Sequence, residues 1–298
     1  KNETIDLLKT KKISLLAIDE AHCVSQWGHD FRPDYTALSL LANRFKEIPR
    51  IALTATADQA TRKDIVDRLK LAEGKTFIGG FDRPNIHYSI LERNNPKKQV
   101  YDFIRNHHAG DSGIIYCISR KKVEDMAEWL LGKNINALPY HAGLPPGVRS
   151  ENQDRFLRED SIIIVATIAF GMGIDISDIE TIIHYGIPKD MESYCQEIGR
   201  AAREKDMQGT CCILWSKGDF VINNIFLKQI DDYELRCKQR EQMKGIELYV
   251  KNTNICRMRL IRDYFQGTYY SSDGFKCNNC DNCMNKKDFS NHLKTLYI

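Results

Sequence analysis

The chain has 298 residues, and because a typical domain holds roughly 150, its length predicts two domains with separate cores. Hydrophobic residues make up 42% and charged residues 28%, which excludes disordered and fibrous proteins. The 43 basic and 40 acidic residues leave a net charge of +3, which alone does not indicate a nucleic-acid ligand. We expect neither a signal peptide nor a membrane span, since no apolar run approaches the roughly 20 residues that cross a bilayer.

Short apolar runs alternate with longer segments of helical pattern along most of the chain. Most of these runs lack polar alternation, which is typical of strands covered on both faces. The predicted strands cover residues 13–18, 50–53, 113–118, 161–166, 181–185 and 210–215. The predicted helices cover residues 33–45, 58–71, 97–107, 121–131, 146–157 and 191–202. This alternation predicts an α/β fold with parallel sheets.

Two changes in composition divide the chain. Turn and breaker signals gather between Gly79 and Pro96, including the run Arg83–Asn85, and predict a domain boundary. From Ser216 onward the strands stop, and residues 218–266 form helices by pattern. We therefore predict four parts, which cover residues 1–82, 83–216, 217–290 and a tail of residues 291–298.

A pair of acidic residues, Asp19 and Glu20, follows the first predicted strand directly. A carboxylate at the carboxyl end of a parallel strand faces the crevice in which α/β sheets bind ligands. Two adjacent acids can divide the work, one holding Mg²⁺ through water and the other orienting an attacking water. An acidic turn with a helix cap is the simpler alternative.

The sequence around this pair resembles a known family. The run Asp19–His22 resembles the Walker B box of superfamily 2 helicases, and Cys23–Pro33 resembles the aromatic-rich loop of RecQ-type DNA helicases. In such a loop, aromatic faces stack on bases, at about 1–3 kcal/mol per base, and basic groups lie near phosphates. The resemblance adds His22 to the catalytic set. The candidate DNA contacts in this loop are Trp27, His29, Phe31 and Arg32.

Further segments resemble the helicase motifs in the family's order, and that order is more specific than any one motif. They are residues 53–57, 115–120, 140–144, 166–175 and 196–203. The resemblance implies a coupling role for Thr54 and Thr56. It implies DNA contacts by Ser119, Arg120, His141, Thr167 and Gly171, and ATP contacts by Asp175, Gln196 and Arg200.

The last of these motifs supplies two arginines. If the segment is helical, Arg200 and Arg203 project from one face, and permanently charged guanidinium groups suit a γ-phosphate. The resemblance makes Arg203 the arginine finger from the opposite lobe, worth about 10³–10⁵ in rate in related hydrolases. Ala202 stands where the family usually has glycine, and Glu204 where it has aspartate. In a helix an added methyl group is mild, so the role is kept.

Four of the ten cysteines share the spacing of a metal site, with Cys256 followed after 20 residues by Cys277, Cys280 and Cys283. Four thiolates suit tetrahedral Zn²⁺, with an iron–sulfur cluster as the alternative, whereas a reducing compartment disfavours disulfides. The pattern also resembles the RecQ zinc-binding subdomain. Residues 236–298 carry 12 basic and 6 acidic residues, so this part can attract phosphate backbones or form a solvated face.

A phosphate loop is missing from the sequence. Gly74–Thr76 has Leu69 where the loop needs its first glycine, and it ends a helix, so we expect Gly74 to cap that helix. In the resembled family the phosphate loop lies before the acidic box, and only 18 residues precede Asp19, so we expect an incomplete first lobe. Only 15 residues follow Cys283, which leaves no room for the family's winged-helix domain.

The sequence thus predicts two RecA-like parallel-sheet lobes, the first incomplete, followed by a helical zinc-binding subdomain. By resemblance, the parent protein is an ATP-dependent 3′→5′ DNA helicase acting in repair, recombination or replication, and we expect this chain alone to be inactive. The expected cofactors are ATP, Mg²⁺ and Zn²⁺, and the expected partners are single-stranded and partly duplex DNA. We expect a monomer in the cytoplasm, nucleoid or nucleus. The alternatives are a non-hydrolysing DNA-binding module and, less favoured by the aromatic loop and the cysteines, an RNA helicase.

Overall fold

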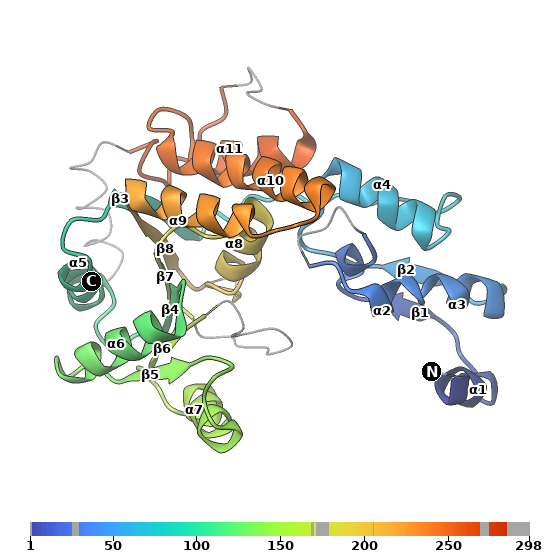
Figure 1. Ribbon diagram of the computed structural model, residues 1–298, viewed down its shortest axis with the longest axis horizontal. Coiled ribbons are helices and arrows are strands. Elements are labelled where there is room, and N and C mark those ends of the chain that lie inside the picture. Colours follow the sequence, from blue (N-terminus) through green and yellow to red (C-terminus); the bar gives the residue numbers. More distant parts are fainter. Residues whose placement is uncertain are drawn as a thin grey trace. The chain divides into compact units, whose positions relative to one another are not determined.

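The computed structural model describes residues 2–25, 30–167, 170, 179–204, 206–268 and 274–284. The chain divides into two compact units (Figure 1). The first holds residues 1–80 and 263–269, and the second holds residues 81–262 and 270–298. Four predicted site residues lie outside the described residues, namely Trp27, His29, Gly171 and Asp175.

The first unit contains a parallel two-stranded sheet, in which Leu16 pairs with Arg50 and Ile18 with Ala52. Its elements are α1 (Asn2–Lys9), β1 (Leu16–Ile18), the 3₁₀ helix η1 (Ala21–Val24), α2 (Pro33–Thr36), α3 (Ser39–Arg44), β2 (Arg50–Ala52) and α4 (Gln59–Arg68). Ile18 and residues of η1 and α4 form its small apolar core.

The strands of this sheet are not covered on both faces, contrary to the prediction. Ile18 is buried, but Ala17 is exposed and Ile51 is 41% exposed. The reason is physical: within the described residues the sheet has two strands, and helices bury only part of each strand. The apolar runs 13–18 and 50–53 therefore predicted two strands correctly, but the prediction that both faces of these strands are buried was wrong.

Helix α4 ends earlier than predicted, and Gly74 does not cap it. Lys70 takes the left-handed conformation (φ 55°) after the helix. The Lys70 N–H donates to the Asp67 carbonyl at 3.3 Å, and the Leu71 N–H donates to the Val66 carbonyl at 2.9 Å. This is the Schellman arrangement, with lysine at the position where glycine is usual.

The second unit is a six-stranded parallel sheet in the order β3-β8-β7-β4-β6-β5. Its strands are β3 (Ile86–Glu92), β4 (Gly113–Cys117), β5 (Ala137–Tyr140), β6 (Ile163–Ala166), β7 (Thr181–Tyr185) and β8 (Gly209–Trp215). The helices that follow strands are α5 (Pro96–His107), α6 (Arg120–Leu131), α7 (Pro146–Arg158) and α8 (Met191–Ile198). The parallel α/β fold is as predicted.

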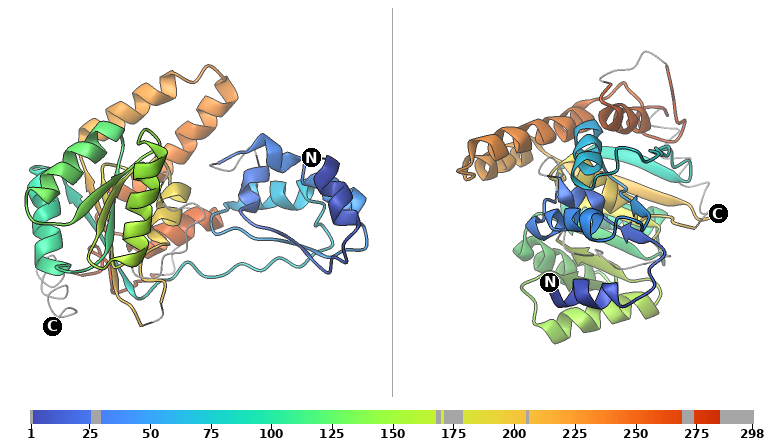
Figure 2. Two further views of the ribbon diagram at one scale, coloured as in Figure 1. Left: turned by 90° about the horizontal axis from the view of Figure 1, so that it is seen from below. Right: turned by 90° about the vertical axis from the view of Figure 1, so that its right-hand side faces the viewer.

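Helices cover both faces of this sheet (Figure 2). Residues of α5 and α6, such as Val100 and Met126, pack on one face against Ile115, Val165 and Ile183. On the other face, Tyr194 of α8 contacts His184 near the carboxyl end of β7, and Phe156 of α7 contacts Phe170, which follows β6. Strands β4, β6, β7 and β8 are therefore buried along almost their whole length.

Within the described residues, three helices follow the last strand, namely α9 (Lys217–Lys228), α10 (Tyr233–Lys251) and α11 (Arg257–Gln266). Helices α9 and α10 pack against each other, and α10 also contacts α8. Within the described part of the chain, no helix is long and apolar enough to cross a membrane.

Candidate functional site

The acidic pair lies at the carboxyl end of β1, as predicted. The Leu53 N–H donates to the Ile18 carbonyl and the Ala21 N–H donates to the Leu53 carbonyl, both at 2.9 Å, so β2 fixes the backbone on either side of the pair. Asp19 Oδ1 accepts the Glu20 N–H at 2.8 Å. Both acidic residues are exposed, and Glu20 has a left-handed backbone (φ 48°). The geometry offers two solvent-facing carboxylates for a cation and a water.

His22 connects the acidic pair to Thr54, which follows β2. Its side chain is 1% exposed, and its Nδ1 lies 3.3 Å from Glu20 Oε2 and 3.0 Å from Thr54 Oγ1. The same Thr54 oxygen accepts the Thr56 N–H at 3.4 Å. The structure thus brings four predicted residues together, from Glu20 to Thr56. This contact chain can transmit a change at the carboxylate to the segment that follows β2.

The described part of the aromatic-rich loop is held by an ion pair. The guanidinium of Arg32 donates to Asp30 Oδ2 at 2.5 and 3.0 Å, and the Arg32 N–H donates to the Cys23 carbonyl at 3.0 Å. Phe31 is 36% exposed. An aromatic ring and a cation therefore face solvent 11 and 12 residues after Glu20.

His22, Cys23 and Asp30 have ligand atoms close together, within 4.8 Å of one another. Burial raises the pKa of Cys23 to about 11, so its thiol stays neutral. Asp30 is already neutralised by Arg32. The trio therefore lacks the negative charge that a cation site needs.

Four predicted DNA contacts lie at the carboxyl ends of three neighbouring strands of the second unit. Ser119 and Arg120 follow β4, His141 follows β5 and Thr167 follows β6. Ser119 Oγ accepts the Lys122 N–H at 3.4 Å and so caps α6. The four residues therefore share one edge of the sheet.

Arg120 and His141 are in the same local cluster. Nδ1 of His141 accepts the Gly143 N–H at 3.2 Å, and its Nε2 lies 3.1 Å from Glu124 Oε1. A Cβ on Gly143 would lie 3.0 Å from Arg120 Nη1 and 3.2 Å from His141 Nδ1, so both side chains lie close against the backbone of this glycine. The cluster presents one cation and several polar groups, a composition that suits a phosphate backbone.

The arginine motif differs from its prediction. Helix α8 ends at Ile198, so Arg200 and Arg203 lie in the turns that follow and not on one helical face. Ala202 is fully buried and left-handed (φ 46°), so its methyl group is not the mild change expected in a helix. After the helix, the N–H groups of Arg200 and Ala201 bond only three residues back, and the Ala202 N–H donates to the Ile179 carbonyl at 2.8 Å, outside the helix. Arg203 is exposed and Arg200 is half-buried.

A buried histidine near this motif was missed from the sequence. His184 Nε2 lies 2.7 Å from Glu197 Oε2, and the ring stacks on Tyr116 with centroids 5.3 Å apart. His184 and Glu197 line a cavity of about 260 Å³ that also reaches Thr167, α9 and α10. The available signal was a polar residue inside the apolar run 181–185. Gln196 lies on the same helix as Glu197 and is half-buried.

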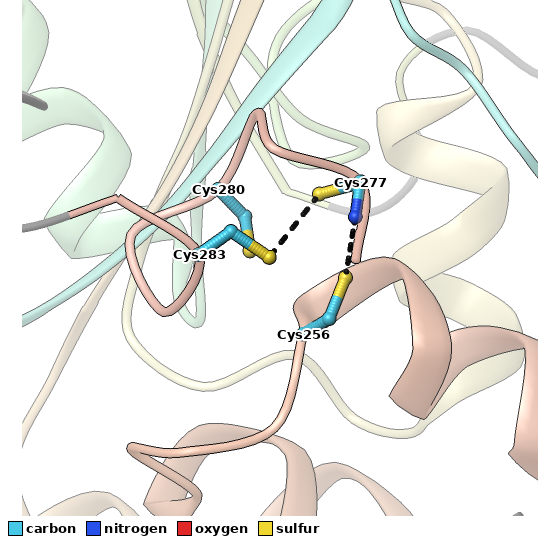
Figure 3. Close-up of side chains that lie close together, drawn as sticks. All are labelled: Cys256, Cys277, Cys280 and Cys283. Atoms are coloured by element: carbon cyan, nitrogen blue, oxygen red, sulfur yellow. Dashed lines mark hydrogen bonds between the residues drawn. The ribbon is translucent and has the colours of Figure 1, made fainter. Parts of the chain in front are cut away.

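The four predicted metal ligands come together (Figure 3). Cys256 stands just before α11, and the other three cysteines lie in the loop of residues 274–284. Their sulfur atoms all lie within 4.8 Å of one another, and Sγ of Cys277 and Cys283 are 4.0 Å apart. Tetrahedral Zn–S bonds of ~2.3 Å place sulfur atoms about 3.8 Å apart, so the geometry fits zinc.

Backbone groups around these sulfur atoms support the same conclusion. N–H groups of Cys277, Arg257 and Asn279 donate to cysteine sulfurs at 3.3–3.4 Å. Such donors stabilise thiolates, the form that binds a metal. Hydrogen bonds from the side chains of Cys277 and Cys280 lower the pKa of Cys256, which favours its thiolate form.

Three family models match successive parts of the chain. The DEAD/DEAH box helicase model matches residues 2–65, the helicase conserved C-terminal domain matches 95–205 and the RecQ zinc-binding model matches 217–284. The chain is also 40% identical over 283 residues to the ATP-dependent DNA helicase RecQ of Haemophilus influenzae, covering 95% of this chain and 45% of that protein. The chain is therefore similar to RecQ-type helicases along almost all of its length.

Other RecQ-type relatives agree. The RecQ-like DNA helicase BLM of Xenopus laevis is 38% identical, over 95% of this chain and 21% of that protein. The ATP-dependent DNA helicase RecQ of Bacillus subtilis is 37% identical, over 96% of this chain and 47% of that protein. The chain thus spans less than half the length of these curated relatives.

A solved structure shares the fold. Saccharomyces cerevisiae Dbp5 bound to RNA and ADP BeF3 aligns with a TM-score of 0.57 at 18% identity, covering 81% of this chain and 68% of that chain. The predicted RecA-like architecture with its helical zinc-binding region is therefore confirmed.

Proposed function

We propose that the whole protein, as its gene encodes it, carries out ATP-dependent unwinding of DNA, moving 3′→5′ along a single strand during repair, recombination or replication. Asp19 holds Mg²⁺ through water, Glu20 activates the attacking water, and Arg203 stabilises the charge that develops on the γ-phosphate. The single observation that carries the proposal is the contact chain from Glu20 through His22 to Thr54. It links a catalytic carboxylate to a neighbouring segment, which coupling of hydrolysis to movement requires.

The DNA contacts are proposed on the composition of two surfaces. Phe31 and Arg32 offer an aromatic ring and a cation in the first unit. Ser119 and Arg120 offer an exposed polar and cationic strand edge in the second, next to the buried ring of His141. Rings that stack on bases and cations that meet phosphates bind single strands without sequence preference. Zn²⁺ held by the four cysteines is a structural cofactor in this proposal.

Replacement of the proposed base tests the function. In the protein as its gene encodes it, Glu20→Gln keeps the shape of the side chain but removes its charge. We expect nucleotide binding within about twofold of wild type and DNA-stimulated phosphate release reduced by about 10²-fold or more. Glu47→Gln, an exposed residue of the same unit, is the matched control.

Two outcomes separate the candidate functions. Wild-type turnover in Glu20→Gln would remove Glu20 from catalysis. Salt-sensitive DNA binding without any DNA-stimulated turnover in the wild type would favour a non-hydrolysing DNA-binding module. The direction of movement is read from duplexes that carry one single-stranded tail. The proposed polarity requires that a 3′ tail supports unwinding and that a 5′ tail does not.

A further inference from the structure

The segment that carries Arg203 is held by two side chains from a distant part of the chain. The arginine turn, residues 199–203, follows α8, and two of its backbone carbonyls accept hydrogen bonds from side chains. Arg83 Nη2 donates to the Ala201 carbonyl at 3.0 Å and to the Ala202 carbonyl at 2.7 Å. Asn85 Nδ2 donates to the Ala202 carbonyl at 2.9 Å. We call these two side chains the carbonyl clamp.

The clamp is itself fixed. Arg83 Nε donates to Asn85 Oδ1 at 3.4 Å, which sets the orientation of the amide. The same amide nitrogen also donates to the Met207 carbonyl at 3.0 Å, beyond the turn. On the opposite side, Asn279 Nδ2 donates to the carbonyls of Pro84 and Ile86 at 2.7 and 3.0 Å. The backbone that bears the clamp is therefore tied on both sides.

The turn needs such support because of Ala202. A non-glycine residue with φ 46° costs roughly 1–2 kcal/mol of backbone strain, and the fully buried methyl group has no room to relax. The Ala202 carbonyl accepts two of the clamp's hydrogen bonds, and its N–H is bound to the Ile179 carbonyl. The next residue is Arg203, whose side chain is exposed. The direction of that side chain follows from the conformation of Ala202.

We infer that Arg83 and Asn85 are positioning residues for Arg203, holding the strained arginine turn so that the guanidinium is oriented for the transferred phosphate before ATP arrives. The inference rests on the proposed function of Arg203. A misplacement of about 1 Å at a charged group in an active site lowers the rate by up to about 10²-fold, so a pre-set turn raises kcat without contacting substrate.

The test uses Asn85→Asp in the protein as its gene encodes it. The change puts an oxygen where Nδ2 was, so the side chain repels the carbonyls of Ala202 and Met207. Asn136→Asp, the same chemical change at an exposed residue of the second unit, is the matched control. Arg83→Lys, which keeps the charge but loses the fork of donors, is a milder second variant in case Asn85→Asp fails to fold.

The kinetic test is a double-mutant cycle, in which Asn85→Asp is measured both alone and together with Arg203→Ala. We expect Asn85→Asp to lower the kcat of ATP hydrolysis by about 10- to 100-fold with KM within about twofold. We expect it to change kcat by less than about twofold when Arg203 is already alanine, because it acts through that side chain. A loss of the same size in both backgrounds would overturn the inference and leave the proposed function standing.

A second measurement does not depend on activity. Amide hydrogen exchange of residues 199–204 reports the order of the turn directly. We expect exchange about tenfold faster in Asn85→Asp than in Asn136→Asp, and unchanged exchange would overturn the inference whatever the kinetics show. A wild type without turnover, or an Arg203→Ala variant with wild-type kcat, would instead overturn the proposed role of Arg203.

Discussion

Glu20 places a proposed catalytic carboxylate on a strained backbone. Its φ of 48° lies in the left-handed region that L-residues with a Cβ rarely adopt. The neighbouring hydrogen bonds on either side, at Ile18 and Ala21, hold the conformation in place. The strain is the cost of presenting the carboxylate at the end of β1, and strain of this kind gathers at functional sites.

This strain predicts an unusual order of stability for two variants. Glu20→Gly and Glu20→Ala both remove the carboxylate and its contact with His22. Because only glycine adopts φ near 48° without strain, we expect the glycine variant to be more stable by about 0.5–1 kcal/mol, after its greater freedom when unfolded is deducted. Urea unfolding measures the difference. Equal stability, or a more stable alanine variant, would show that the backbone is not strained.

Non-glycine residues with a left-handed backbone also limited what could be predicted from the sequence. Glycine is the default left-handed residue, so Gly74 was the natural cap for α4, yet Lys70 takes that position. Ala202 appeared helical because alanine favours helices, yet hydrogen bonds from distant residues hold it outside one. Local preference cannot reveal such positions, because the energy that overrides it comes from tertiary contacts.

At the scale of elements, the arginine turn packs tightly against β8. A Cβ built on Gly209 would lie 2.9 Å from the Cβ of Ala202, closer than two such atoms can approach. Gly209 begins β8, and its N–H donates to the Asn85 carbonyl at 2.9 Å, so the strand cannot move away freely. The arginine turn and β8 therefore pack so closely that the methyl group of Ala202 leaves room only for glycine at position 209.

This fit predicts coupled variants. We expect Gly209→Ala to lower the free energy of unfolding by about 1–3 kcal/mol, because it overpacks a buried contact. Ala202→Gly removes the opposing methyl group, so in that background the cost of Gly209→Ala falls by about half or more. Chemical denaturation of the two single variants and the double variant gives the coupling. Additive losses would mean that the clash is relieved elsewhere.

Elements were predicted where their own pattern was strong. The apolar runs gave β4, β6, β7 and β8 within a few residues, because these strands are covered on both faces. Strand β3 was missed because the breaker residues on both sides of it indicated a boundary, and β5 because it contains Pro139. The cysteine spacing predicted its cluster fully, since thiolates at those intervals have few other uses.

At the scale of the whole molecule, the cysteine loop is joined to the large sheet. The Asp281 N–H donates to the Tyr88 carbonyl at 3.0 Å, and Asp281 Oδ2 accepts the Ile90 N–H at 2.9 Å. Asp281 also pairs with Arg257, a nearly buried guanidinium, at 2.7 Å. The loop thus continues the sheet beyond β3, which is otherwise its edge strand.

Removal of the metal should therefore weaken the protection of amide groups in β3. In metal-free protein prepared with a chelator, we expect faster amide exchange at Tyr88 and Ile90, whose N–H groups bond to the loop. The amide of Ile183 in β7, an interior strand, serves as the internal control. Unchanged protection at Tyr88 and Ile90 would show that the loop keeps its place without a metal.

The loop beside β3 also affects whether the protein stays free of self-association when the metal is lost. An edge strand with free N–H and C=O groups is a template on which another chain can add a strand. Seven residues of β3 would become such a template if the loop detached. Loss of the metal would then show first as self-association that rises with protein concentration, well before the core unfolds. For this chain the four cysteines would therefore protect the protein against self-association as well as stabilise the fold.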